Sequence, residues 1–248
     1  MKKVMIIMSL FIFSVTLSAG PLRSPQDERE GYGGPNFGVM FIDVGSINNY
    51  LKPAGYTVVD STFSTIGGGG YGLVNGRLLL GGSGYAVLAN TTESTSVKGK
   101  VSGGYGFFEV GYAVFKMDNF SLFPVLGIGG GGMSFDLVPL ASNSLRFYDI
   151  LLDPKRSSKL SCGSFALELA LQNTFTLTVV EEKNEDKIEA FKMGGAIKLG
   201  MIYDLNNDWS MDEFEVSSAP KIPREKYFIN FTILFGGYEK DLKKEEQK

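Results

Sequence analysis

The sequence has no histidine at all and, among its 248 residues, a single cysteine, Cys162. Without histidine there is no Ser-His-Asp triad, no Cys-His pair and no histidine-ligated zinc. A lone thiol forms no internal disulfide, and with no histidine or second thiol to activate it we interpret Cys162 as a buried or loop residue. We therefore expect a protein that is not an enzyme and that carries no cofactor.

Long hydrophobic runs are also scarce. Only one is present near the start of the chain, from Val4 to Leu17, and it follows Lys2 and Lys3. Small residues come next, which is the pattern of a cleaved secretory signal. We predict a signal peptide over residues 1–19, because the run is short for a bilayer-spanning anchor. No later segment stays apolar for the ~20 residues that a membrane-spanning helix needs.

Excess positive charge is missing as well. The signal peptide takes two of the 24 basic residues and none of the 27 acidic ones, which leaves 22 basic against 27 acidic residues. A chain of this charge lacks the basic surface that a nucleic acid requires. We expect no nucleic-acid partner, and the length fits one domain with a buried core.

What the chain does have is alternation between apolar and polar residues. In the segment 165–179 the odd positions, except Asn173, are large and apolar, whereas the even positions are small or polar, as in a strand with two unlike faces. Similar patterns predict eight strands, over residues 37–43, 58–74, 77–89, 97–116, 120–138, 165–180, 188–204 and 226–238.

Alternation alone fits two architectures. A soluble lipocalin-like barrel would turn the large residues inward around an apolar ligand, whereas a membrane barrel would turn them outward to lipid. The strands are long enough for the ~9 to 11 residues of a tilted membrane strand. Short turns also alternate with long connections, as in outer-membrane barrels. The sequence thus favours an all-β protein, a closed antiparallel up-and-down barrel of about eight strands with glycine-rich strands 2 to 5.

The pattern resembles that of the small outer-membrane β-barrels of Gram-negative bacteria. The resemblance rests on an exported chain, eight long alternating strands and an aromatic-rich last strand from Phe228 to Phe235. It implies an N-terminal segment over residues 20–36, a barrel over residues 37–238 and a charged tail over residues 239–248. It also implies location in the outer membrane, with membrane lipid as the partner.

In two of the predicted strands, the apolar residues change from odd-numbered to even-numbered positions or the reverse. Tyr105 and Phe107 continue an odd-numbered apolar series, but Phe108 and Val110 continue on even numbers. The strand over residues 120–138 changes phase in the same way across its glycines. If one face is to stay outward, a β-bulge is needed near Gly106 and another among the glycines of the next strand.

Glycine comes in bands, over residues 67–70, 81–84, 103–106 and 127–132. Folding the chain about Asn75 and Gly76 places Gly70 opposite Gly81, and later turns bring the other bands to the same level. We expect a side-chain-poor belt across four strands, where an internal segment or a small apolar ligand approaches the wall. The segment 46–56, with a short helix ending before Pro53, is one such guest, and the N-terminal segment is the other. The candidate binding glycines are Gly68, Gly70, Gly82, Gly84, Gly104, Gly106 and Gly130.

Charged residues on the polar faces predict an ion pair in the interior, formed by Glu168, Lys192 and Lys198. The interior of an eight-stranded barrel is just wide enough for side chains to fill, so we interpret these charges as structural. A weak calcium candidate consists of Asp204, Asn206, Asp208 and Glu215, which follow calcium-loop spacing but lack the glycine at the sixth position.

We therefore expect an outer-membrane barrel with a structural or binding role and without catalysis. Two alternatives remain open. One is a soluble periplasmic lipocalin-like barrel that binds a small apolar ligand, and the other is a narrow outer-membrane pore.

Overall fold

The computed structural model describes residues 28–117, 119–140, 158–184, 187–206, 208–211 and 214–241. The predicted signal peptide and most of the charged tail lie outside the described residues. The long strands are β1 (Glu28–Phe41), β2 (Thr62–Val74), β3 (Leu78–Glu93), β4 (Val97–Tyr112), β6 (Phe120–Pro139), β7 (Ser158–Lys183), β8 (Lys187–Asp204) and β11 (Glu225–Asp241). Three short strands are β5 (Phe115–Lys116), β9 (Asp208–Met211) and β10 (Phe214–Glu215).

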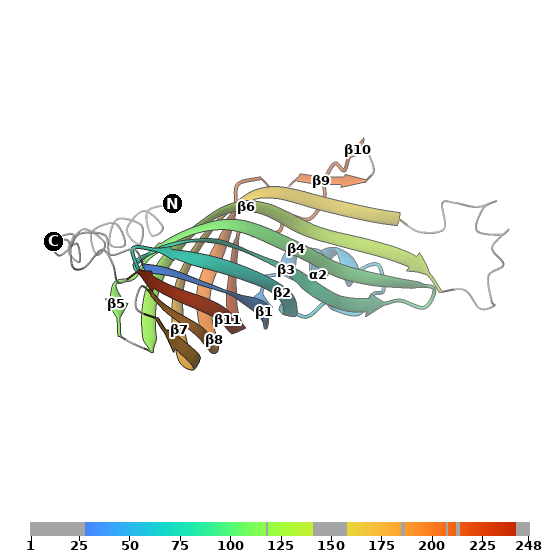
Figure 1. Ribbon diagram of the computed structural model, residues 1–248. Coiled ribbons are helices and arrows are strands. Elements are labelled where there is room, and N and C mark those ends of the chain that lie inside the picture. The colour runs from blue at the N-terminus through green and yellow to red at the C-terminus, as the bar shows by residue number, and fades with distance from the viewer. Residues whose placement is uncertain are drawn as a thin grey trace.

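The eight long strands close into an antiparallel ring (Figure 1). Each long strand pairs with the next one along the chain, and β11 returns to pair with β1, for example through Phe37 opposite Phe231. The start of β1 and the end of β11 therefore lie at the same end of the barrel, together with the connections from β2 to β3, from β4 to β6 and from β7 to β8. We call this the terminal end and the opposite one the loop end. The predicted fold class, an up-and-down barrel of eight long strands, is confirmed.

The first strand begins earlier than predicted. β1 starts at Glu28 rather than at residue 37, so part of the expected N-terminal segment belongs to the wall. This part of the strand shows no alternation of apolar and polar residues, because Gly31, Gly33 and Gly34 have no side chains. They pair with glycines of β2, which extends the glycine belt to a fifth strand.

The register of the first hairpin is one residue from that expected. Gly70 pairs with Gly82, not with Gly81. The cause is the turn: Val74 pairs with Leu78, so the loop has three residues, and both Asn75 and Gly76 take positive φ. A three-residue loop shifts the register by one relative to a two-residue loop.

The two predicted bulges are wrong. β4 and β6 pair without any shift from Val97 opposite Pro139 to Gly111 opposite Val125. The apolar series changes phase because the interior is itself partly apolar, so that Phe107 is buried inside while Phe108 is exposed outside. The register shifts in the ring fall elsewhere, at Val87 in β3 and at Thr178 in β7.

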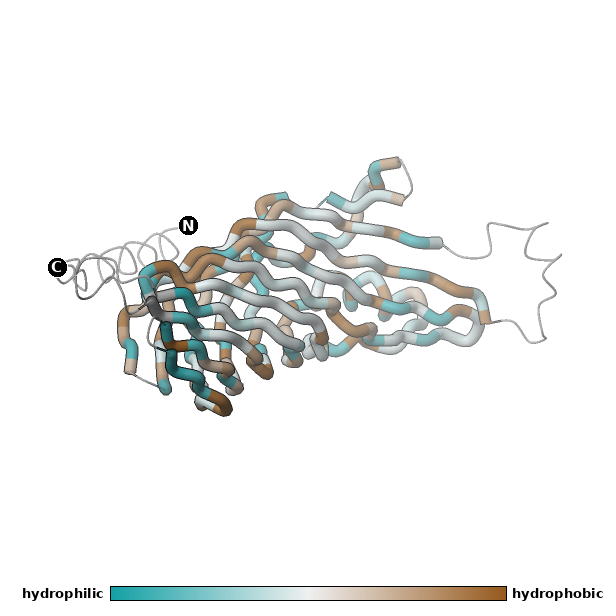
Figure 2. The backbone as a smooth tube through the Cα atoms, viewed as in Figure 1, coloured by the Kyte–Doolittle hydropathy of each residue, from teal (hydrophilic) through white to brown (hydrophobic). Residues whose placement is uncertain are grey.

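At several positions the glycine belt leaves no room for a side chain. The middle stretches of the glycine-rich strands are pale in the hydropathy view (Figure 2), between brown apolar and teal polar stretches. A Cβ atom at Gly129 would lie 2.9 Å from Cα of Phe107, and one at Gly67 would lie 2.6 Å from Cα of Tyr85. Real Cβ atoms do not approach a neighbouring strand so closely, so these positions require glycine.

The segment 46–56 contains the predicted short helix, α2 (Gly45–Leu51), at the loop end. Ile47 and Leu51 are buried in the interior apolar cluster. Outside the barrel wall, Tyr50 donates a hydrogen bond to the carbonyl of Ser218 (3.0 Å). The helix therefore joins the loop between β8 and β11 in covering this end. Among the described residues, no helix is long and apolar enough to cross a membrane.

Candidate functional site

Lys198 of β8 lies between two carboxylates in the middle of the interior. Its Nζ is 2.5 Å from Oε1 of Glu168 on β7 and 2.8 Å from Oε1 of Glu109 on β4. Ser83 of β3 donates a hydrogen bond to the same oxygen of Glu109. The three charged side chains are at most 7% exposed. Four strands thus meet in a cluster that has two acidic groups and one basic group and is shielded from solvent.

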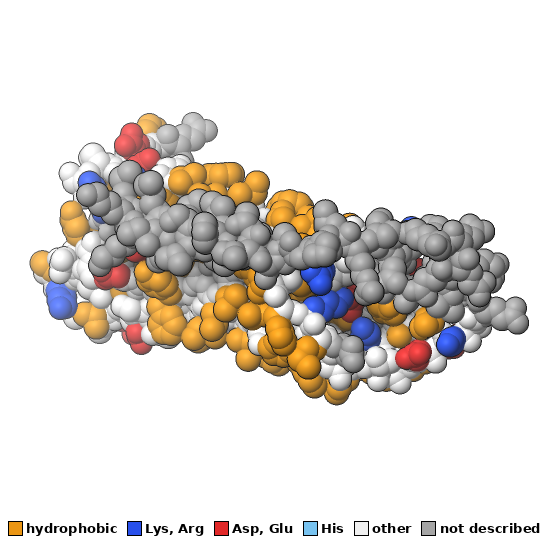
Figure 3. All heavy atoms as spheres, turned by 90° about the vertical axis from the view of Figure 1, so that its left-hand side faces the viewer, with side chains coloured by type: hydrophobic (Ala, Val, Ile, Leu, Met, Phe, Trp, Pro, Cys, Tyr) orange, Lys and Arg blue, Asp and Glu red, His pale blue; other side chains and the backbone are white. Residues whose placement is uncertain are grey.

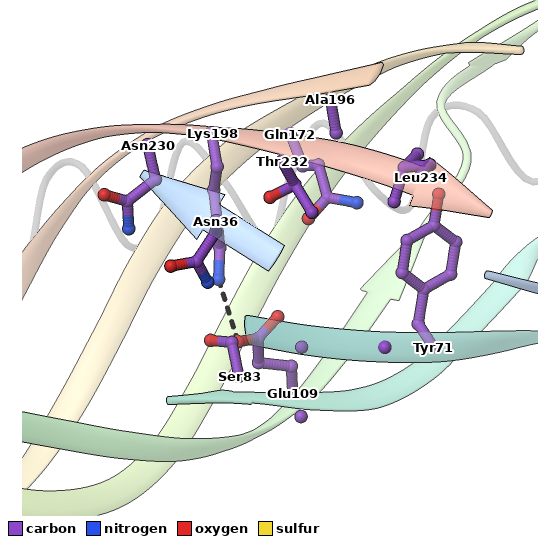
Figure 4. Close-up of a pocket in the computed structure, with 13 residues that line it drawn as sticks. Asn36, Tyr71, Ser83, Glu109, Gln172, Ala196, Lys198, Asn230, Thr232 and Leu234 are labelled. Carbon is purple, nitrogen blue, oxygen red and sulfur yellow. Dashed lines mark hydrogen bonds and ion pairs between the residues drawn. The ribbon is translucent and has the colours of Figure 1, made fainter. Parts of the chain in front are cut away.

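A small cavity of about 30 Å³ adjoins this cluster. Its volume is close to the share of one molecule in liquid water. Figure 4 shows the amide of Asn36 beside the ammonium of Lys198, with Ser83 and Glu109 opposite. Oδ1 of Asn36 is buried and has no hydrogen-bond partner in the protein, so a water molecule suits the space. The lining residues are Asn36, Gly69, Gly70, Tyr71, Gly82, Ser83, Glu109, Gln172, Ala196, Lys198, Asn230, Thr232 and Leu234.

Aromatic rings separate this cluster from the loop end. Phe228 lies next to Lys198, with Nζ 5.9 Å from the ring centroid, and contacts Tyr85 at a centroid distance of 6.0 Å. Beyond it, Tyr105 stacks on Phe107 at 6.2 Å. These rings are all at most 5% exposed and form part of one apolar cluster inside the barrel. The barrel interior is filled by side chains at this level.

A second ion pair lies on the far side of the rings. Lys226, at the start of β11, contacts Oδ2 of Asp204, at the end of β8, and both side chains are almost fully buried. Tyr105 donates to the same carboxylate oxygen at 3.3 Å. Each charge of this buried pair compensates the other, so that neither is left alone in the interior.

A third cluster lies at the terminal end. Glu30 of β1 accepts hydrogen bonds from Lys192 (3.1 Å) and Lys116 (3.0 Å), and from the hydroxyl of Tyr32. This cluster has one acidic and two basic groups. It links β1 to β8 and to the turn after β4, across the interior.

The structure thus brings together two of the three residues predicted for an interior ion pair. Glu168 and Lys198 are in contact, whereas Lys192 belongs to the terminal cluster. Sequence reasoning missed Glu30, because the residues before 37 were not recognised as strand. It also missed the pairing of Asp204 with Lys226, which only the register of β8 with β11 decides.

The seven candidate glycines point outward, not into the interior. In each strand they alternate with inward residues such as Tyr85, Tyr105 and Phe107, which are buried. Of these seven glycines, only Gly70 and Gly82 line the interior cavity. Some inward glycines lie against aromatic rings: a Cβ at Gly131 would be 2.5 Å from Cδ1 of Tyr105, and one at Gly127 would be 3.4 Å from Cδ1 of Phe107. The space on the inner side of the belt is therefore filled by the protein's own aromatic side chains. The helix α2 packs at the loop end instead.

The calcium candidate residues do not converge. Asp204 turns into the barrel toward Lys226, while Oδ1 of Asn206 accepts a hydrogen bond from the backbone of Phe165 at 3.0 Å. Asp208 and Glu215 lie on β9 and β10 and are exposed. Within the described part of the chain, no three acidic, cysteine or histidine side chains are grouped to hold a metal ion.

Cys162 is buried near the loop end of β7, opposite Trp209 of β9. It packs in the interior apolar cluster with Met133 and Ala166. This is the setting of a packing residue, as expected from a thiol without an activating base.

No family model matches the chain, and no curated protein does. The fold is similar to solved outer-membrane proteins. The attachment invasion locus protein Ail of Yersinia pestis is 13% identical, covering 86% of this chain and 99% of Ail, with a TM-score of 0.37. The outer membrane protein OprG from Pseudomonas aeruginosa is 12% identical, covering 86% of this chain and 95% of OprG, with a TM-score of 0.31. The outer membrane protease OmpT from Escherichia coli is 9% identical, covering 91% of this chain and all of OmpT, with a TM-score of 0.29.

Proposed function

We propose that this protein is an outer-membrane β-barrel with a structural or binding role and without catalysis. The proposal is supported chiefly by the direction in which the two faces of each strand point. Phe165, Leu167 and Leu171 of β7 are exposed outside the barrel, while Glu168 and Gln172 between them are buried inside. A protein in water would not leave such a row of large apolar residues uncovered.

The apolar outer face continues around the ring. Exposed residues of this kind on neighbouring strands include Phe37, Ile66, Leu80, Leu88, Phe108, Val110, Leu126, Ile128, Ile197, Leu199, Ile229, Phe231 and Ile233. Figure 3, which looks onto the terminal end, shows apolar side chains along the flank of the barrel. A hydrocarbon layer would cover this belt and keep its apolar side chains away from water, as in membrane barrels.

The periplasmic lipocalin-like alternative requires an interior that holds an apolar ligand. The interior of the present barrel instead contains three ion clusters and packed aromatic rings. The pore alternative requires a continuous water path. The cavity in the middle of the barrel has room for about one water molecule. Both observations favour the structural or binding role.

Two substitutions of equally exposed outer residues test the membrane location. Ile197 is 51% exposed in the middle of β8, and Val138 is 49% exposed near the loop end of β6. We expect Ile197→Arg to destabilise the inserted barrel by about 2–4 kcal/mol, whereas Val138→Arg should cost about 0–1 kcal/mol, because the penalty falls toward the membrane surface. The measurement is urea unfolding of the protein folded into phosphatidylcholine vesicles.

Cell fractionation gives the direct test. The protein should sediment with outer membranes and require detergent for release. Recovery of folded protein in the soluble periplasmic fraction would contradict the proposal. Planar-bilayer recording separates the pore alternative: we expect no conductance steps from inserted protein, and regular steps would favour the pore.

A further inference from the structure

A groove lies on the outside of the barrel wall at the terminal end. It has a volume of about 650 Å³, within the range of small-molecule sites. Two aromatic rings, Phe191 of β8 and Phe235 of β11, form its apolar half, and both are exposed. Two acidic residues, Glu182 of β7 and Glu189 of β8, form its polar half. The remaining lining residues are Val180, Ala190, Gly236 and Gly237.

The groove exists because the wall lacks a side chain there. A Cβ at Gly237 would meet no atom within 4 Å, so this glycine borders open space. Beside it, the register of β7 with β8 shifts between Thr178 and Val180. This irregularity changes which residues of β7 face outward below it. Gly237 and the bulge together leave a hollow between the two rings and the two carboxylates.

The acidic half of the groove carries more negative than positive charge. Glu182 pairs directly with Glu189, and Glu189 pairs directly with Glu239 of β11. Side chains in such cross-strand pairs lie about 4.5–5.5 Å apart, and like charges there repel each other. Lys187 contacts Glu189 and is a basic group beside the row. One lysine in contact with a row of three carboxylates leaves the row open to a further cation.

The position of the groove identifies the occupant. Phe191 and Phe235 continue the lipid-facing rows that include Met193 and Ile233. The groove therefore lies where the apolar belt ends and the charged rim begins, which is the level of lipid headgroups if a bilayer covers the belt. One side of the site is apolar and continuous with the belt, and the other side is acidic with a neighbouring lysine.

We propose that this groove binds a phospholipid with a primary ammonium headgroup, namely phosphatidylethanolamine. The acyl chains lie over Phe191 and Phe235, the ammonium group donates hydrogen bonds to Glu182 and Glu189, and the phosphate lies toward Lys187. A primary ammonium has three N–H donors, whereas the trimethylated nitrogen of phosphatidylcholine has none. The site should therefore distinguish these two lipids. This inference rests on the proposed membrane location.

The test compares lipids that differ only at the headgroup nitrogen. Refolded protein in detergent micelles is titrated with dioleoyl phosphatidylethanolamine or dioleoyl phosphatidylcholine, and lipid retention is measured by native mass spectrometry. We expect wild-type protein to retain phosphatidylethanolamine about fivefold more strongly, as for one to two charge-assisted hydrogen bonds in a partly exposed site. Equal retention of both lipids would overturn the inference.

Charge variants separate the site from the rest of the surface. Glu182→Gln combined with Glu189→Gln should abolish the preference. The matched control is Glu93→Gln combined with Glu225→Gln, two exposed glutamates near the loop end, which should keep it. A preference that survives the first pair of substitutions, or that the control pair also removes, would contradict the proposal.

A second pair of variants tests the shape of the groove. Gly237→Leu should fill the hollow and reduce the preference while leaving every charge in place. Gly163 on β7 is the matched control, because a Cβ there also meets no atom within 4 Å. Gly163→Leu should retain the preference. If both variants bind phosphatidylethanolamine as wild-type protein does, the groove is not the site.

Insertion is measured separately, in vesicles of phosphatidylcholine alone, by heat-modifiable electrophoretic mobility. Failure of the wild-type protein to insert would overturn both the membrane proposal and the lipid site. Insertion with equal retention of the two lipids would overturn the lipid site alone. A lysine-rich peptide that binds through Glu182 and Glu189, with no preference between the lipids, would instead identify the groove as a site for a basic protein segment.

Discussion

At the scale of single residues, Lys198 is the cation of the ion cluster in the middle of the barrel. It contacts two carboxylates, Glu109 and Glu168, that are shielded from water. The net contribution of a buried pair is small, because removing charges from water costs about as much as their attraction returns. Loss of one partner is different, since the remaining charge stays buried without compensation.

We predict that Lys198→Met destabilises the folded barrel by about 3–5 kcal/mol, because two neighbouring carboxylates lose their cation. The measurement is urea unfolding in lipid vesicles at neutral pH. The triple variant, Lys198→Met with Glu109→Gln and Glu168→Gln, should recover much of the loss, because the uncompensated charge is gone.

Lys98→Met is the control for the lysine substitution. Lys98 pairs with Glu93 at 2.9 Å, but both side chains are about half exposed. Its loss should cost about 0–1 kcal/mol, as for surface pairs in general. If Lys198→Met costs no more than Lys98→Met, the cluster in the interior does not stabilise the barrel as described.

At the scale of single strands, glycine is required where neighbouring backbones crowd together. The inward glycines of the belt lie at such places, whereas the outward ones, apart from Gly132, have more room. A Cβ at Gly129 of β6 would lie 2.9 Å from Cα of Phe107, but one at Gly106 of β4 would have its nearest neighbour at 3.9 Å, the carbonyl oxygen of Ser83. The two positions belong to the same belt and face opposite sides of the wall.

We predict that Gly129→Val prevents folding or lowers stability by several kcal/mol, because the backbone of the neighbouring strand β4 must move away to admit the side chain. Gly106→Val should be tolerated, with a change of about 1 kcal/mol or less, since valine suits an exposed strand position. The measurement is the fraction of protein that gains the mobility of the folded barrel. Equal behaviour of the two variants would show that the belt only fills space.

The outward glycines Gly82 and Gly104 fall between these cases. A Cβ at Gly82 would lie 2.9 Å from the carbonyl oxygen of Phe107, and one at Gly104 would lie 3.3 Å from that of Tyr85. We predict that Gly82→Val combined with Gly104→Val impairs folding less than Gly129→Val alone. The same assay ranks the variants, and the reverse order would contradict this account of the belt.

At the scale of the whole molecule, the pairing of β1 with β11 closes the ring. Closure removes every free edge from the eight long strands and so protects the wall from pairing with other chains. Two of the three clusters of charged residues join strands that are far apart in the sequence, through Glu30 with Lys192 and through Glu109 with Lys198. The barrel is therefore held both around its wall and across its interior.

Closure predicts a specific cross-link. Val39 and Ile229 are direct partners on β1 and β11, and both face outward. In a Cys162→Ser background, Val39→Cys with Ile229→Cys should form a disulfide on mild oxidation, because direct cross-strand neighbours lie at a suitable distance. The readout is a mobility shift that a reducing agent reverses.

The control for the cross-link pairs Val39→Cys with Ile233→Cys, which is four residues further along β11 and beyond reach. It should remain reduced under the same oxidation. A disulfide in the control pair, or none in the direct pair, would mean that the ring closes in another register or stays open.

The eight strands and their two faces could be predicted because alternation is a local property of the sequence. Residues 165–180 predict a strand with one apolar and one polar face, and β7 has these faces. The two bulges could not be predicted correctly, because a change of apolar phase has two physical causes. Either a β-bulge shifts the strand by one residue, or the side chains that face the interior change from polar to apolar. In β4 the second applies, because the rings of Tyr105 and Phe107 fill the interior.

The candidate site was predictable only in part. Glu168 and Lys198 could be predicted because they lie on the polar faces of two strands that are consecutive along the chain, and their long side chains meet although Lys198 pairs with Gln172. Glu30 lies 162 residues from Lys192, and no local pattern relates them.

The sequence by itself determined the class of fold, the number of long strands and the absence of histidine chemistry, because each depends on composition or on short-range periodicity. Only the tertiary structure decided which face of the wall is outside, since the same alternation fits a barrel whose apolar residues face inward and one whose apolar residues face outward. It also decided which glycines lie against a neighbouring backbone and which charges meet inside. Those facts depend on register and closure, which bring together residues that are distant along the chain.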